Sequence, residues 1–146
     1  MRRIARTVVW LIALCVLANG CAWYGKARSA TELDGTWDLQ VSDAPAFALT
    51  VTFSGSAWEC HWGAAESRAT ARGTLTLRRD VDPKQVDLLI AEHPDAQLVG
   101  KSTLGIYKVQ DGELTLAANE AGAATRPISF QREGSMFVFV GKRSRE

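Results

Sequence analysis

The chain holds one pair of adjacent residues with the chemistry of a nucleophile and its base, Cys60 and His61. A cysteine nucleophile needs that base within hydrogen-bond reach. Residues 58–62 alternate between apolar and polar, which predicts a strand, and adjacent residues of a strand point to opposite faces. The two side chains therefore cannot share a proton. We expect Cys60 to be a small buried residue between Trp58 and Trp62, and His61 to be exposed.

A second stretch, Gly100-Lys101-Ser102, matches the end of a phosphate-binding loop. That loop requires a glycine five residues before Gly100, where this chain has Asp95, and it requires a strand–loop–helix context that the sequence does not predict. The sequence also lacks Gly-x-Ser-x-Gly, His-Glu-x-x-His and Gly-x-Gly-x-x-Gly. We therefore interpret this stretch as an ordinary loop before a strand.

The acidic residues and the metal-ligating residue types are dispersed. The acid pairs Asp80/Asp82 and Glu59/Glu66 lie at or near predicted turns, where carboxylates are solvated and cap backbone amides. The two histidines and the cysteine of the folded part lack the spacing of zinc ligands. The sequence thus predicts no catalytic residues, no metal and no cofactor, and we expect the protein not to be an enzyme.

The N-terminal segment has the composition of a secretory signal. Its first six residues include three arginines and no acid, and an uncharged apolar run follows. That run is slightly short for a membrane-spanning helix, which needs about 20 apolar residues. The stretch Leu17-Ala18-Asn19-Gly20-Cys21 resembles the bacterial lipobox, although Ala18 and Asn19 depart from its usual residues. A plain cleaved signal and a retained anchor are the alternatives.

The lipobox resemblance implies a domain organisation. Residues 1–20 would be a lipoprotein signal peptide, Cys21 the lipid-attachment site, residues 21–31 a tether and residues 32–146 the folded domain. The first partner is then the membrane, bound through the N-terminal lipid. By the sorting rules of such lipoproteins, Ala22 in place of an aspartate favours the outer membrane of a two-membrane cell, facing the periplasm.

Composition and charge bound the function classes. A chain of 146 residues that is 47% hydrophobic suits one globular domain with its own core. Of its 17 Lys and Arg residues, the first twenty positions hold three and no acid, which leaves 14 bases against 16 acids and a net charge of −2. Such a domain does not attract nucleic acid by its overall field. With Cys60 as the one cysteine of the domain, no internal disulfide is expected.

Beyond residue 31 the apolar residues recur with the period of two that is typical of β-strands. Nine segments show it: residues 37–41, 47–53, 58–62, 73–77, 86–90, 104–109, 114–116, 128–130 and 136–140, the last of them apolar on both faces. Asp111-Gly112 predicts a type I′ hairpin, because both central residues of that turn need positive φ. No stretch has sustained helical periodicity. The pattern fits a sandwich and a closed barrel equally well.

The tripeptide Gly35-Thr36-Trp37, at the head of the first predicted strand, resembles the Gly-x-Trp signature of lipocalins and calycins. In that family the tryptophan closes the base of the barrel, and a basic residue near the end of the last strand packs on it. The resemblance implies that Arg143 or Lys142 lies across Trp37, with Arg143 and Trp37 as the barrel-closing pair. A cation over an indole face is worth about 0.5–2 kcal/mol.

The chain from about Leu33 to Arg143 also resembles a family of small exported domains of unknown function, abundant in planctomycete-type bacteria and described as lipocalin-like. The resemblance is carried by residues 33–37, 49–53, 72–75, 82–88, 104–107, 112–116 and 126–130 and by the closing apolar strand. Two departures are Leu116-Ala117-Ala118, where relatives often carry a cysteine, and the tryptophan-rich stretch 58–62. The resemblance implies an all-β, antiparallel up-and-down barrel of eight or nine strands, and it implies no activity.

Four aromatic residues are candidates for lining a pocket in such a barrel: Trp58, Trp62, Phe53 and Tyr107. They either pack the core or form an aromatic wall. Small eight-stranded barrels lie at the boundary between filled and hollow, and the many large apolar residues here favour a filled one. Arg126, which precedes Pro127 at the start of a predicted strand, either pairs with a carboxylate at the barrel mouth or is a surface charge.

These observations predict a lipid-anchored, non-enzymatic binding module that holds a small apolar ligand or an envelope partner at the barrel mouth. A structural or interaction domain with a filled core is the alternative, and a hydrolase with an unfamiliar site is a remote one. A cavity below about 300 Å³ would favour the structural domain over the binding module.

Overall fold

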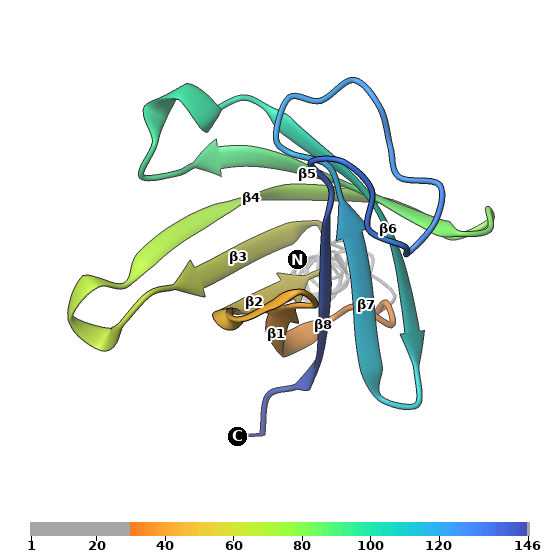
Figure 1. The fold of residues 1–146 in the computed structure, drawn as a ribbon, viewed down its shortest axis with the longest axis horizontal. Coiled ribbons are helices and arrows are strands. Elements are labelled where there is room, and N and C mark those ends of the chain that lie inside the picture. The colour runs from red at the N-terminus through yellow and green to blue at the C-terminus, as the bar shows by residue number, and fades with distance from the viewer. Residues whose placement is uncertain (1–29, 146) are drawn as a thin grey trace, which may run out of the picture.

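The computed structural model describes residues 30–145, which form an eight-stranded antiparallel barrel (Figure 1). The strands are β1 (Gly35–Val41), β2 (Ala44–Ser54), β3 (Ala57–Trp62), β4 (Ala69–Arg78), β5 (Lys84–Glu92), β6 (Ser102–Gln110), β7 (Glu113–Ala118) and β8 (Phe137–Arg143). The expected signal peptide (residues 1–20), the lipid-attachment site Cys21 and the tether up to residue 29 lie outside the described residues.

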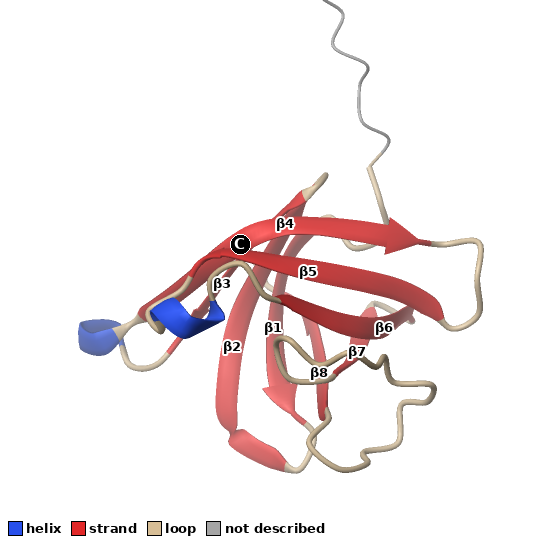
Figure 2. Ribbon diagram, turned by 90° about the horizontal axis from the view of Figure 1, so that it is seen from above, coloured by secondary structure: helices blue, strands red, loops and turns tan. Residues whose placement is uncertain are grey.

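Helical structure within residues 30–145 consists of two 3-10 turns, η1 (Ala65–Ser67) and η2 (Ala96–Leu98). Both lie at the same end of the barrel, beyond the ends of β3 and β5 (Figure 2). Residues 30–145 contain no candidate for a membrane-spanning helix.

The barrel is closed because β1 pairs with β2 along one side and with β8 along the other. Across the β1–β8 seam, Trp37 is opposite Arg143 and Val41 is opposite Phe139. Every strand then has two neighbours and no edge is left unpaired. Closure decides between the sandwich and the barrel, and it confirms the predicted fold class.

The β6–β7 hairpin has the predicted turn. Asp111 and Gly112 have φ values of 53° and 76°, the two positive angles that a type I′ turn requires. In this hairpin Tyr107 is opposite Leu116 and Gly105 is opposite Ala118. The inward-facing residues of β6 are therefore paired with the inward-facing residues of β7.

The prediction of a strand at residues 128–130 is wrong. These residues lie in the connection between β7 and β8, residues 119–136, which we call the strap (Figure 1, blue loop). A closed barrel has no edge with which a ninth strand could pair. Ile128 is instead 87% exposed, and the ring of Phe130 lies 5.1 Å from Lys108 Nζ on the outside of β6.

The strap covers a small second core on the outer wall. Ile106, Ala117, Met136 and Val138 are buried in it, with Phe130 and Val140 packed against them. Met136 and Phe130 belong to the strap itself, and the other members alternate with inward positions along β6, β7 and β8. The arrangement explains why the last strand is apolar on both faces: Phe139 belongs to the inside of the barrel and Val138 to the strap side.

The main core fills one end of the barrel, which we call the base. Its largest fully buried side chains include Trp37, Tyr107, Leu33, Leu39 and Leu114. Leu33 precedes β1, and its carbonyl oxygen accepts a hydrogen bond of 2.8 Å from Trp37 Nε1. The residues before β1 therefore form a cap that seals the base.

Candidate functional site

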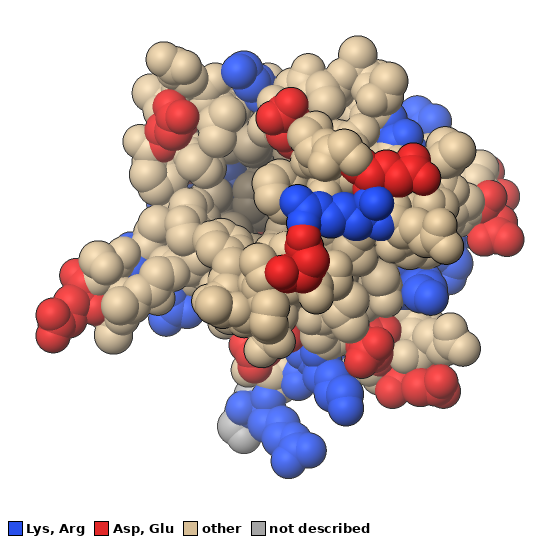
Figure 3. All heavy atoms as spheres, viewed as in Figure 1, with Lys and Arg blue, Asp and Glu red and all other residues tan. Residues whose placement is uncertain are grey.

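The opposite end of the barrel interior is hollow. A cavity of about 770 Å³ opens there, at the end where the chain turns from β1 into β2. In the space-filling view this face is hollowed, and acidic and basic side chains border the hollow (Figure 3). The sequence-based expectation of a filled or nearly filled barrel is therefore corrected: this barrel is filled at the base and open at the mouth.

Small side chains create the hollow. Cys60, Ala71, Thr103 and Ala118 line the cavity from four different strands, and Cys60 is directly opposite Ala71. At the base, the corresponding inward positions carry large residues such as Trp37 and Tyr107. In a small barrel the size of the inward side chains decides whether the interior is packed or empty, so the cavity follows from this uneven distribution.

Trp58 forms part of the cavity floor and is held in a fixed orientation. Its Nε1 donates to the carbonyl oxygens of Thr74 (3.1 Å) and Leu89 (3.2 Å). The Leu89 carbonyl approaches so closely that a Cβ on Gly73 would lie 1.8 Å from its oxygen, so only glycine fits at position 73. The register between β4 and β5 shifts at this point, between Arg72 and Gly73, where β5 has one extra residue, Ala91.

Aromatic side chains continue up to the mouth. Trp62 stacks on His93, with ring centroids 5.5 Å apart and an interplanar angle of 29°. Phe47 and Phe137 also line the cavity, and they are 47% and 42% exposed because they face the opening. Large exposed aromatic residues gathered around one opening are typical of a surface that binds another apolar molecule.

The four sequence-predicted pocket residues fall into two groups. Trp58 and Trp62 line the cavity. Phe53 and Tyr107 are buried in the main core, and they belong to its filled part. Their strands and inward orientation were predictable, whereas their height along the barrel axis depends on strand register and tilt.

Cys60 contributes a thiol to the cavity wall, and burial raises the pKa of that thiol to about 11. His61 points away from it, to the outer wall. There, His61 Nδ1 lies 2.8 Å from Thr70 Oγ1 and His61 Nε2 lies 2.7 Å from Glu59 Oε1. The two neighbours are thus on opposite faces of β3, as the alternation predicted, and His61 does not serve as a base for this thiol.

The mouth carries the polar groups of the cavity. Asp43, in the β1–β2 turn, forms an ion pair with Arg132 of the strap. Glu120 and Asn119 line the opening from the start of the strap, and His93 lines it from the end of β5. An apolar interior with a few polar groups at its opening is the usual composition of a small-molecule site.

The sequence-predicted closing pair lies at the base. The guanidinium carbon of Arg143 is 4.4 Å from the centroid of the Trp37 ring. Arg143 also donates to the backbone oxygens of Asp34 and Glu32, the latter at 2.9 Å. The arginine therefore ties the cap before β1 to the last residue of β8.

Arg126 lies on the outer wall, away from the mouth. Its Nη1 donates to the carbonyl oxygens of Val86 (3.1 Å) and Gly105 (2.7 Å), and its Nη2 pairs with the carboxylate of Asp87. The sequence left two alternatives for Arg126, a pair with a carboxylate at the barrel mouth or a surface charge. The carboxylate partner is present, but it lies on the outside of β5 and β6 and not at the mouth. Arg126 anchors the strap to the barrel.

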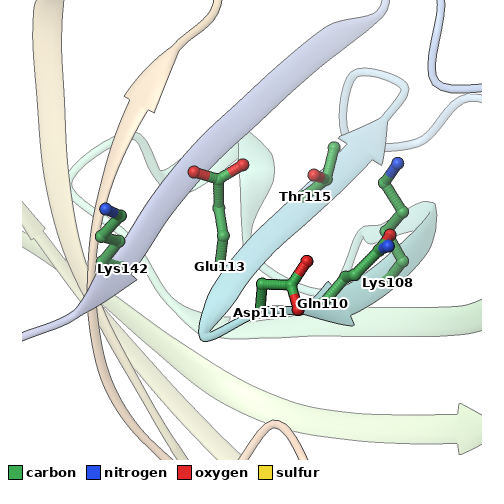
Figure 4. Close-up of a pocket in the computed structure, with 6 residues that line it drawn as sticks. All are labelled: Lys108, Gln110, Asp111, Glu113, Thr115 and Lys142. Atoms are coloured by element: carbon green, nitrogen blue, oxygen red, sulfur yellow. The ribbon is translucent and has the colours of Figure 1, made fainter.

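A polar groove of about 400 Å³ runs along the outside of the β6–β7 hairpin and β8 (Figure 4). Its lining residues come from three neighbouring strands and one turn: Lys108, Gln110, Asp111, Glu113, Thr115 and Lys142. Glu113 and Thr115 alternate with the inward Leu114 and Leu116. The groove is lined by acidic, basic and neutral polar side chains and by no apolar residue. This composition is typical of an outer wall that faces solvent.

The described residues hold no group of three or more His, Cys, Asp and Glu side chains placed to bind a metal ion. No protein-family model matches the chain, and no curated protein and no solved structure has significant similarity to it. The resemblance to a family of exported lipocalin-like domains therefore stays a prediction, and the candidate site is argued from its own geometry.

Several cavity residues were not found from the sequence. Phe137 and Phe139 are two residues apart on either side of Val138. This period of two could have predicted that both face the inside of the barrel. Asp43, His93 and Arg132 lie in turns and loops, where no periodicity marks the direction of a side chain. Their convergence at the mouth depends on the closure of the barrel.

Proposed function

We propose that this protein is a lipid-anchored binding module of the cell envelope that holds a small apolar ligand in the open half of its barrel. The observation that carries the proposal is the cavity of about 770 Å³ with aromatic and aliphatic walls. Sites for small molecules usually measure about 300–1,000 Å³ and are mostly apolar. An interior of this size and lining supports ligand binding over the alternative of a structural domain with a filled core.

The non-enzymatic part of the proposal is supported by the chemistry of the cavity wall. The thiol of Cys60 has a pKa raised to about 11 by burial, so very little of it is the nucleophilic thiolate at neutral pH. The hydrogen-bonded group of Glu59, His61 and Thr70 lies on the outer wall of β3 and β4. It does not face the cavity in which a substrate would be held.

Ligand binding is tested by titrating the full chain, in nanodiscs of phosphatidylcholine that accommodate its N-terminal segment, with the neutral fluorescent probe N-phenyl-1-naphthylamine. We expect saturable probe emission and quenching of tryptophan fluorescence, because Trp58 and Trp62 line the site. Ala71→Leu adds bulk inside the cavity and should weaken binding about tenfold or more. Ala48→Leu makes the same change on the exposed outer wall of β2 and should leave binding unchanged.

Equal effects of the two leucine variants, or no saturable emission above that of empty nanodiscs, would contradict binding in the cavity. Native mass spectrometry of protein taken from its own host then identifies the natural ligand. If the protein from its host carries no bound species and also fails to bind the probe, the alternative of a structural or interaction domain would be favoured.

The envelope location is supported by the basic N-terminus, the apolar run and the lipobox-like stretch that ends at Cys21. Growth with labelled palmitate should give a labelled protein. Cys21→Ser should abolish the label, whereas Cys15→Ser, a change of the same type inside the apolar run, should retain it. Label in the Cys21→Ser variant, or none in the wild type, would contradict the lipid anchor.

A further inference from the structure

The charged side chains at the cavity mouth do not balance. Three formally charged residues line the cavity: Asp43, Glu120 and Arg132. Asp43 and Arg132 form an ion pair with each other. Arg132 Nε also donates to the carbonyl oxygen of Met136 at 3.2 Å. The guanidinium charge is therefore already compensated and its orientation fixed, so Arg132 is poorly placed to receive an anionic ligand.

Glu120 is the remaining charge, and no ion pair joins it to a cation within residues 30–145. Its turn is fixed to the barrel, because Gly122 N–H donates to Ser102 O at 2.9 Å and Ala123 N–H donates to Glu120 O at 3.1 Å. The stem of Lys101 passes beside Gly122, where a Cβ would lie 3.1 Å from Lys101 Cδ. Lys101 does not line the cavity.

His93 contributes an aromatic ring to the mouth. Its Nδ1 accepts a hydrogen bond of 2.9 Å from the backbone N–H of Asp95, which fixes the orientation of the ring. The ring stacks on Trp62, and the two form an aromatic platform at the opening.

The mouth thus combines one uncompensated carboxylate with exposed aromatic rings, above an apolar interior. Aromatic faces attract cations, and the Glu120 carboxylate attracts cations and repels anions. We infer that the preferred ligand is a cationic amphiphile, an aliphatic tail ending in an ammonium group. Its tail lies in the cavity and its head lies between Glu120 and the Trp62–His93 platform. The inference rests on the proposed function, because it names the ligand class of the same site.

The test compares three ligands with one tail and different heads, namely decylamine, decan-1-ol and decanoate. At pH 7.5 the first is a cation and the last an anion. Each competes with N-phenyl-1-naphthylamine for the full chain in phosphatidylcholine nanodiscs. We expect the amine to bind about five- to tenfold more tightly than decanoate, with the alcohol between them. Raising NaCl from 20 mM to 500 mM should shrink this ratio by screening the exposed charge.

Two variants that each remove one negative charge separate a local effect from net charge. Glu120→Gln should lower the amine-to-decanoate ratio about threefold. Asp111→Asn, at the hairpin turn on the opposite end of the barrel, should leave that ratio unchanged. Asparagine tolerates the positive φ of 53° at position 111, so this control keeps the turn.

The outcomes distinguish the inference from the proposed function. If the naphthylamine probe binds but decanoate displaces it as well as decylamine does, or if none of the three displaces it, the inference is overturned and the cavity remains a binding site. An equal shift in Glu120→Gln and Asp111→Asn would also overturn it. If the probe itself does not bind, the proposed function and the inference fail together.

Discussion

The guanidinium of Arg143 lies over the indole ring of Trp37, 4.4 Å from its centroid, and the two residues are opposite each other across the seam that closes the barrel. Trp37 is fully buried, and its Nε1 donates to Leu33 O. Arg143 donates to the carbonyl oxygens of Glu32 and Asp34. One stacked pair thus joins the first strand, the last strand and the cap of the base.

Removal of this cation should destabilise the barrel. Arg143→Ala loses the cation–π contact and two hydrogen bonds to the cap, and we expect a loss of about 1–3 kcal/mol in the free energy of unfolding. Urea titration followed by tryptophan fluorescence measures it. Lys142→Ala, at the exposed neighbouring position, should change the stability by less than about 0.5 kcal/mol. Equal losses in the two variants would contradict a specific role of Arg143.

The anchor of the strap is testable at Arg126, whose side chain is 17% exposed. Arg126→Gln removes the pair with Asp87 and the bonds to two strand carbonyls, so we expect a loss of about 1–2 kcal/mol. Local opening of the strap should then expose its chain to protease. Limited trypsin digestion should cut after Arg132 several-fold faster than in the wild type. Arg78→Gln, at the exposed end of β4, serves as the control and should leave that rate unchanged.

Tyr107 offers a substitution that we expect not to harm the fold. Its hydroxyl is buried in the base near the Glu32 carboxylate, and in the part of the chain that the structure describes no group forms a hydrogen bond of standard geometry with it. Tyr107→Phe therefore removes a desolvated polar group without breaking a well-formed hydrogen bond, and it should leave the stability unchanged or raise it by up to about 1 kcal/mol. A loss above about 1 kcal/mol in urea unfolding would reveal a partner for the hydroxyl.

The same residue predicts an alkaline loss of stability. Burial, and then the nearby Glu32 carboxylate, raise the pKa of Tyr107 to about 12 from an ordinary value of 10.0. Between these two pH values the unfolded chain releases the phenolic proton and the folded chain keeps it, so the free energy of unfolding falls as the pH rises. Urea midpoints at pH 9 and pH 11 should drop further for the wild type than for Tyr107→Phe. Equal drops in the wild type and in Tyr107→Phe would show that the alkaline loss of stability comes from another group.

Cys60 reports on the state of the cavity. The thiol pKa is about 11, against an ordinary value of 9.0, so its thiolate fraction at pH 8 is about a hundredfold below that of a free cysteine. Alkylation by iodoacetamide, followed by mass spectrometry of the peptide that contains Cys60, should be slower by about that factor. The rate should rise with pH up to about 11. Cys60 in the urea-unfolded chain should react at the ordinary rate, and equal rates in both states would contradict the burial of this thiol.

The sequence by itself determined the strands and the direction of their side chains. The period of two predicted nine strands, and eight of them form, because successive residues of a strand must face opposite sides of a sheet. Asp111-Gly112 marked its hairpin through the positive φ that the turn requires. The same alternation separated Cys60 from His61. Local geometry decides each of these features, so local sequence suffices to predict them.

Only the tertiary structure decided closure and the place of the hollow. Pairing of β1 with β8 joins residues that are about a hundred positions apart, and it leaves no edge for residues 128–130 to extend. Alternation predicts which residues face inward, but the height of each residue along the barrel depends on the register and tilt of every strand pair. For that reason Phe53 and Tyr107 fill the base, Trp58 and Trp62 border the cavity, and Asp43, Glu120 and Arg132 meet at a mouth that no local pattern marks.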